Sequence, residues 1–467
     1  MIRPLHIITS LLSIISLGLF SSCDKKHSVE DYTAYFGGEV LNPHVNYVLF
    51  MKDNNVIDTL FLDAKNRFLH KFDSLTPGLY SFVHYPEYQN VFFDKNDSLM
   101  VIINSKDFDN SIVFCGRGDE KNNFLMEMYL ANEKDRSSMY DVFFRDSKEF
   151  IKNVDSSFVI RKKLYEKNKE KIQWNPSFDS LALVALNLPH FNKKEMYPYA
   201  HKFITGHNII NELPKNYYEH RTKVDLNNAA FANYNPFVKY VTSLLNNQTF
   251  TDNKGDIDEF GLENSIKKLN IADTLIKNSK IKNIVLNRMA FRYLMEEQNI
   301  NNNKEYIDRY LKLSTDKKMQ SEIKGISNNI KKLSAGNKLS NESFVNEKGE
   351  SVDLSKIIKN QTVIFFYSTK AQSHLIGVHK KVMAYKQKHP NIDFIGINID
   401  DSKDDWLKKL TEFDHKNILE IHAVDFEKLK ENWVIYNNHR TILLNADGTI
   451  KNAFVHLFDV NFEDCLK

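Results

Sequence analysis

The chain is poor in cysteine. It has three in 467 residues, Cys23, Cys115 and Cys465, and they lie far apart in the sequence. No Cys-x-x-Cys pair is present, and neither Cys115 nor Cys465 sits where a helix N-terminus would activate a thiol. A disulfide between these two and a pair of separate thiols both remain open.

The chain also lacks an excess of charge of either sign. It has 63 basic and 60 acidic side chains, a formal net charge of +3. This balance gives no reason to expect a nucleic-acid partner. The hydrophobic content of 42% is enough for globular cores, and the length predicts two or three domains.

Long apolar runs are missing after the N-terminus. Arg3 is followed by "LHIITSLLSIISLGLF" and then by Ser21, Ser22 and Cys23. This pattern resembles a bacterial lipoprotein signal, which implies removal of residues 1–22 and attachment of lipid to Cys23. Residues 23–30 are then a linker, and the protein is expected on the cell-envelope membrane, facing the periplasm. An uncleaved anchor helix and an ordinary signal peptide are the alternatives.

Residues 31–118 alternate between apolar and polar side chains, with turn signals such as Pro77-Gly78 between the segments. This pattern predicts a small β-sandwich. From 119 to 335 the apolar period becomes helical. The best example runs through Met319, Ile323, Ile326, Ile330 and Leu333, with Asp316 as its predicted N-cap and Gly336 beyond its end.

A glycine pair, Gly116 and Gly118, lies between the β-rich and helical parts. Such a pair before a helix suggests a phosphate-binding loop, but the third glycine and the Lys-Ser or Lys-Thr pair are missing. We interpret this segment as the exit from a strand into a helix.

Residues 336–467 alternate between strands and helices, which predicts parallel strand pairing. "TVIFFY" (362–367) is a buried strand, and a helix is expected over 374–388. "FIGINID" is a second strand, followed by a helix with Trp406. "RTILLNADGTIKNAFVHLF" is a closing hairpin that turns at Asp447-Gly448. Only a short tail follows Phe458, so the last helix is expected to be incomplete.

On these features, residues 336–467 resemble the thioredoxin-like domain of TlpA-type disulfide reductases and their AhpC/thiol-peroxidase relatives. The order of a β-rich unit, a helical middle and this domain behind a lipoprotein signal is similar to a set of Bacteroidetes lipoproteins. The predicted fold is therefore a multidomain α+β protein with three parts: a sandwich (31–118), a helical domain (119–335) and a thioredoxin-like α/β domain (336–467).

The residues that would carry the family's chemistry are missing. The resemblance places two thiols at the positions of Ala371 and His374, and a cis-proline at the position of His439. Because a thiolate is the attacking group in disulfide exchange, the residues predict a redox-inactive module that binds an envelope protein or peptide.

Two other functions remain open. One is residual thiol-disulfide oxidoreductase or antioxidant activity, which the resemblance implies if the protein is an enzyme. The other is metal binding without any further cofactor. In this fold His374 and His439 face each other, and His379 follows one helical turn later, so two or three imidazoles could bind zinc or copper.

Overall fold

The computed structural model describes residues 32–466, except 54, 256, 257, 259, 260, 298, 401 and 414. The predicted signal peptide, the linker and Cys23 lie outside the described residues. By its internal contacts the chain divides into two compact units. Unit 1 contains residues up to Arg221 and Asn233–Tyr240, and unit 2 contains Thr222–Ala232 and the chain from Val241 onward. The helical part that follows the sandwich is therefore shared between the two units.

Unit 1 begins with two four-stranded sheets, ordered β4-β1-β7-β8 and β3-β2-β5-β6. Their strands are β1 (Ala34–Leu41), β2 (Tyr47–Lys52), β3 (Asn55–Phe61), β4 (Arg67–Phe72), β5 (Gly78–His84), β6 (Glu87–Phe93), β7 (Ser98–Asn104) and β8 (Val113–Arg117). Strands β1 and β7 pair in parallel, and the other pairs are antiparallel.

One aromatic core joins the two sheets. Phe36 of β1 contacts Phe50 of β2 and Phe82 of β5 at ring-centre distances of 5.5 Å, and all three side chains are fully buried. Alternate residues of each strand supply this core, because successive side chains of a strand point to opposite faces. The two sheets therefore pack face to face, as the alternation in the sequence predicts.

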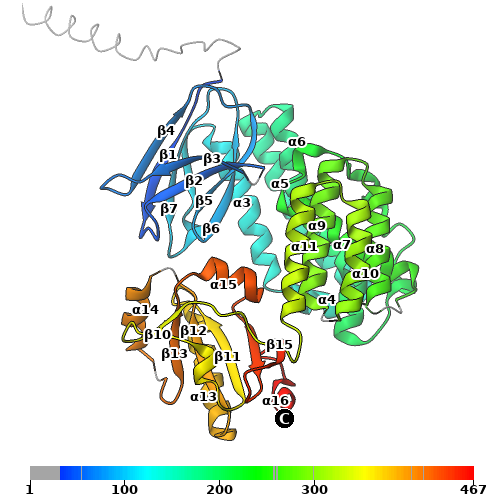
Figure 1. Cartoon of the computed structure of the whole chain (residues 1–467). Helices are drawn as coiled ribbons and strands as arrows, with labels where there is room; N and C mark the ends of the chain where they lie inside the picture. Colours follow the sequence, from blue (N-terminus) through cyan, green and yellow to red (C-terminus); the bar gives the residue numbers. More distant parts are fainter. Residues whose placement is uncertain are drawn as a thin grey trace, which may run out of the picture. The chain divides into compact units, whose positions relative to one another are not determined.

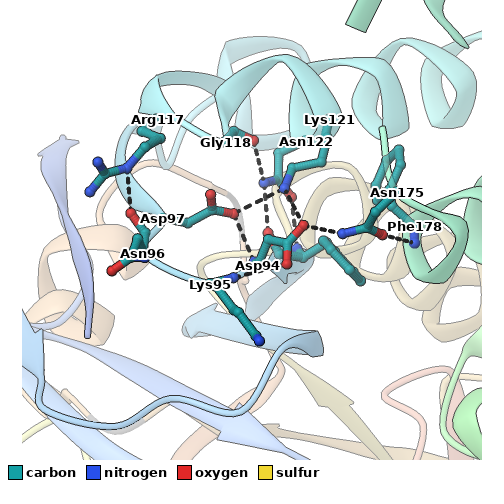
Figure 2. A network of polar contacts seen from close by, with 11 residues as sticks. Asp94, Lys95, Asn96, Asp97, Arg117, Gly118, Lys121, Asn122, Asn175 and Phe178 are labelled. Carbon is teal, nitrogen blue, oxygen red and sulfur yellow. Dashed lines mark hydrogen bonds and ion pairs between the residues drawn. The ribbon is translucent and has the colours of Figure 1, made fainter. Parts of the chain in front are cut away.

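The glycine pair lies where β8 leads into helix α3 (Asp119–Arg136). Figure 2 shows that the side chains around this exit form one polar network. Lys121 donates to Asp94 and to Asp97 at 3.2 Å, and Asn122 accepts from the Phe92 N–H at 2.7 Å. The Lys121 side chain is only 11% exposed, so its buried positive charge needs these two carboxylates to stabilise it.

The structure excludes a phosphate loop at this exit. Gly118 has a φ of 99°, and a Cβ on it would lie 2.4 Å from the Asp97 carboxyl carbon. Burial raises the pKa of Asp97. The space beside Gly118 therefore already contains a carboxyl group of the chain, which leaves no room for a phosphate there.

Helices follow in both units. Unit 1 contains α2 (Phe108–Ser111), α3, α4 (Met139–Phe144), α5 (Ser147–Ile172) and α6 (Pro176–Thr205). Unit 2 contains α8 (Leu262–Leu275), α9 (Ser279–Glu296), α10 (Ile300–Leu313) and α11 (Lys317–Lys332), and α7 (Asn235–Asp252) runs across the division after Tyr240. Asp316 accepts from the Met319 N–H at 3.0 Å, which confirms it as the N-cap of α11. Among the described residues, no helix has the length and apolar character that crossing a membrane requires.

The rest of unit 2 is built on a seven-stranded sheet ordered β10-β9-β13-β12-β11-β14-β15. Its strands are β9 (Phe344–Asn346), β10 (Ser351–Val352), β11 (Thr362–Tyr367), β12 (Asp393–Asn398), β13 (Leu419–Ala423), β14 (Arg440–Leu444) and β15 (Ile450–His456). Its helices are α12 (Leu354–Ile357), α13 (Gln372–Lys388), α14 (Lys403–Leu410), α15 (Phe426–Trp433) and α16 (Phe462–Cys465).

Strands β11, β12 and β13 run parallel, whereas β14 and β15 are antiparallel additions to the β11 side. Helices α13, α14 and α16 share a core with one face of the sheet, and Trp433 of α15 contacts Phe366 on the other face. Figure 1 shows α13 against the sheet. This strand order with helices on both faces is a thioredoxin-like fold. Helix α16 has four residues, and its Phe462 belongs to the core of the sheet.

Candidate functional site

Asp400, two residues after the end of β12, anchors the loop between β11 and α13 by hydrogen bonds. This buried carboxylate accepts from the Ser368 hydroxyl at 2.5 Å, from the Thr369 hydroxyl at 2.6 Å and from the Thr369 N–H at 2.7 Å. Asn398, at the end of β12, donates to the same carboxylate at 2.9 Å. The loop that leads to the thiol positions is therefore held in one conformation.

The thiol positions contain no sulfur. Ala371 is the N-cap of α13 and makes no side-chain cap bond, and His374 lies on the first turn. Both cysteines in the described part of the chain are free: Cys115 is exposed on β8 of unit 1, and Cys465 lies in α16 against the sheet core. The residues of this site therefore offer no thiolate for disulfide exchange.

His374 and His439 lie together, as the sequence predicts. Their ring centres are 4.4 Å apart and the ring planes are nearly perpendicular, at 85°. His374 comes from α13, and His439 immediately precedes β14. Two regular elements thus bring the imidazoles together from positions 65 residues apart in the sequence.

The imidazoles have hydrogen-bonding capacity that the described residues do not use. Both ring nitrogens of His374 and Nδ1 of His439 are buried without a hydrogen-bond partner. Burial, together with the nearby histidines His439, His379 and His456, lowers the pKa of His374 to about 4. His374 is therefore neutral at pH 7, with one ring nitrogen able to accept a hydrogen bond or bind a metal ion.

Sequence reasoning missed two residues of this site. His456, at the end of β15, stacks on His439 at 5.4 Å, and the Phe458 ring lies about 6 Å from all three histidines, at 6.0, 5.9 and 6.2 Å. A signal was available, because a hairpin turning near Gly448 pairs Arg440 with His456, and the structure has this pairing. The site is therefore a cluster of three histidines and one phenylalanine, which we call the histidine cluster.

His379, the third histidine of the predicted metal set, is occupied elsewhere. Its Nδ1 lies 2.8 Å from the Leu375 carbonyl oxygen, and its Nε2 lies 3.2 Å from a carboxylate oxygen of Glu420. Both His379 and Glu420 are almost completely buried. Since neither ring nitrogen is free, the structure leaves His379 outside the group that could bind a ligand.

The chemistry of the groups around His379 and Glu420 fixes which atom donates in each hydrogen bond. Trp406 donates to the Tyr367 hydroxyl at 2.8 Å, and that hydroxyl donates to Glu420 at 2.6 Å. A carbonyl oxygen can only accept, so Nδ1 of His379 must donate to Leu375. The contact between Nε2 and Glu420 then requires one further proton, shared by the pair. A Cβ on Gly396 would lie 2.4 Å from Glu420, so β12 leaves space for this carboxylate.

Among residues 32–466, apart from the eight undescribed positions, no group of three or more histidine, cysteine, aspartate or glutamate side chains is arranged to hold a metal ion. The cis peptide bond that the structure does contain precedes Pro86, in the sandwich. At the position where the resemblance implies a cis-proline, the chain has His439, whose Nδ1 has no hydrogen-bond partner among the described residues.

No protein-family model matches the chain, and no curated protein matches it. Solved structures similar to it include a thioredoxin-like protein from Bacteroides caccae, with 15% identity, a TM-score of 0.35, and coverage of 59% of this chain and 92% of that one. Another is the thioredoxin domain of a thiol-disulfide oxidoreductase from Bacteroides vulgatus, with 20% identity, a TM-score of 0.21, and coverage of 26% and 89%. A conserved protein of unknown function from Bacteroides fragilis has 14% identity, a TM-score of 0.24, and coverage of 29% and 99%. The description of residues 336–467 as thioredoxin-like rests on the strand order given above.

Proposed function

We propose that residues 336–467 are a thiol-free binding module that holds a segment of another polypeptide at the histidine cluster. One observation carries the proposal: the thiol positions contain Ala371 and His374, and the His374 ring has two buried nitrogens without a partner beside His439. Leaving such groups unpaired costs roughly 1–3 kcal/mol each, so a ligand that supplies a partner gains that amount on binding.

The surroundings favour a polypeptide as the ligand. Ile376 on α13 is 54% exposed, and Phe458 and Val460 after β15 are 39% and 93% exposed. Apolar side chains of a peptide can cover these groups while one of its backbone N–H groups donates to the neutral His374 imidazole. We therefore expect an extended peptide with apolar side chains to be preferred over a charged one.

A thiol-disulfide oxidoreductase is the second candidate, because several similar structures have that name. Turnover would have to use Cys115 or Cys465, and neither belongs to the site. We therefore place this candidate second. An insulin-reduction assay with dithiothreitol separates the two candidates: the binding module predicts no acceleration above the blank, and acceleration that Cys115→Ser or Cys465→Ser removes would establish the oxidoreductase.

The binding proposal is tested by selecting peptides from a displayed random library on the full chain. We expect selected peptides to bind at least about tenfold more weakly to Phe458→Ser and Ile376→Ser, because hot-spot contacts lie in apolar patches. Phe203→Ser is the matched control, since Phe203 is 88% exposed and belongs to unit 1. Equal binding to all variants, or no enriched peptide, would reject the proposal.

We propose further that Cys23 carries a lipid that holds the protein on the cell-envelope membrane, facing the periplasm. The support is the sequence of residues 1–23. Metabolic labelling with an alkyne fatty acid should mark the wild-type chain and leave Cys23→Ser unmarked. Labelling that persists in Cys23→Ser would contradict the lipid anchor.

A further inference from the structure

We infer that His374 and His439 are the two protein ligands of a site for an imidazole-preferring divalent transition metal, Cu²⁺ before Zn²⁺. The inference goes beyond the proposed function, because it requires two imidazoles and no peptide. It rests on the geometry of the pair, on the groups around it and on the elements that hold it.

The first support is distance. A metal–nitrogen bond is about 2 Å long, which places the centres of two imidazoles on one ion about 4.5 Å apart when the two bonds are at right angles. The ring centres of His374 and His439 are 4.4 Å apart. Nδ1 of His439 and both nitrogens of His374 lack a partner among the described residues, so no hydrogen bond must be broken before an ion binds.

The second support is the chemical nature of the surroundings. The ionisable groups that act on His374 are His439, His379 and His456, and no carboxylate is among them. Ca²⁺ and Mg²⁺ bind through oxygen ligands, so this environment does not suit them. Neutral imidazoles suit Cu²⁺ and Zn²⁺, and for such ligands Cu²⁺ binds more tightly than Zn²⁺.

The third support is the backbone. His374 lies on the first turn of α13, and the His439 N–H donates to the Asn437 side chain at 2.8 Å just before β14. As the side chains stand, no three ligands in the described part of the chain converge on one point. The site therefore has two protein ligands, with water completing the coordination. The nearest further imidazole is that of the exposed His456, whose ring centre lies 5.4 Å from the ring centre of His439.

The test is a calorimetric titration of the full chain in detergent, without a histidine tag, with CuCl₂ and separately with ZnCl₂. We expect one Cu²⁺ per chain and weaker binding of Zn²⁺. The variant His374→Ala/His439→Ala should bind at least about tenfold more weakly, since even outer-shell changes cost ten- to a hundredfold in metal affinity. His207→Ala/His415→Ala is the matched control, because it also removes two histidines that lie outside the cluster.

The spectrum of bound Cu²⁺ provides a second readout. Electron paramagnetic resonance of the wild-type complex should show coupling to two imidazole nitrogens, reduced to one in either single variant. If the double alanine variant fails to fold by circular dichroism, His374→Gln/His439→Gln replaces it. Binding that is equal in the wild type and the pair variant, binding lost equally in the control, or no stoichiometric binding would each overturn the inference. Peptide binding is measured with EDTA present, so it can fail or succeed independently.

Discussion

Two histidines of helix α13, His374 and His379, are five residues apart and differ in their hydrogen bonding. His379 uses both ring nitrogens, one on the Leu375 carbonyl and one on Glu420, whereas neither nitrogen of His374 has a partner. The first histidine belongs to a satisfied network inside the domain. The second lies on the first turn of α13, beside His439, which immediately precedes β14.

The comparison separates polar groups that stabilise the fold from polar groups that are available to a ligand. A buried polar group with all its partners makes its domain specific and stable, and removing one partner is costly. A group left without a partner carries a cost in the folded protein, which a ligand can remove. We therefore expect the largest stability effects in the satisfied networks and the largest binding effects in the histidine cluster.

The largest effect is expected at Glu420. Glu420→Ala leaves Tyr367 and His379 without their buried partner and should lower the free energy of unfolding by about 3–5 kcal/mol. Glu420→Gln should cost roughly 1–2 kcal/mol, because its amide can accept from Tyr367 and donate to a neutral His379. Urea unfolding followed by tryptophan fluorescence measures both. Equal losses would contradict this expectation, because they would show that the amide does not replace the hydrogen bonds of the carboxyl group.

Removing one partner from the network in Figure 2 should also lower the free energy of unfolding, by a smaller amount. Lys121→Met removes the cation between Asp94 and Asp97, whose side chains are 25% and 5% exposed, and should cost roughly 2–3 kcal/mol. The loss should become smaller at low pH, because burial raises the pKa of Asp97 and this carboxyl group loses its charge there. A cost that does not change with pH would contradict the assignment of this network to charge pairing.

The pH dependence sharpens the contrast at His374. Its pKa in the folded protein is lowered from 6.5 to about 4 by burial and by the neighbouring histidines. Between these values the unfolded chain binds a proton that the folded chain does not, so stability should decrease as pH falls from 6.5 towards 4. Nuclear magnetic resonance titration of the imidazole protons, assigned with His374→Gln, measures this pKa. A midpoint near 6.5 would contradict the buried environment.

The smallest effect on stability is expected at the histidine cluster itself. Neither ring nitrogen of His374 has a hydrogen-bond partner among the described residues. The variant His374→Ala/His439→Ala therefore breaks no hydrogen bond of that ring and removes unpartnered polar atoms. Its free energy of unfolding should stay within about 0.5 kcal/mol of the wild type, or rise. A loss above about 2 kcal/mol in urea unfolding would show that the pair belongs to the fold.

The sequence predicted the elements that have a strong local pattern. The strand ending at Tyr367, the cap at Asp316 and the turn at Gly448 each depend on neighbours within a few residues, and the structure contains all three. The pairing of His374 with His439 was predictable only through the resemblance, since it joins distant positions. Glu420 was missed because β13 gives no local sign that a carboxylate within it will find two buried partners, Tyr367 and His379.

The division of the chain into units has a consequence for synthesis. The boundary is crossed after residues 221, 232 and 240, so unit 1 is incomplete until Tyr240 has been made, although its sheets end at Arg117. By then residues 222–232, which belong to unit 2, have already been synthesised, whereas the rest of unit 2 begins only at Val241. The sequence of unit 1 is therefore complete only after part of unit 2 has been synthesised. A single truncation anywhere between residues 222 and 240 would leave both units without part of their chain.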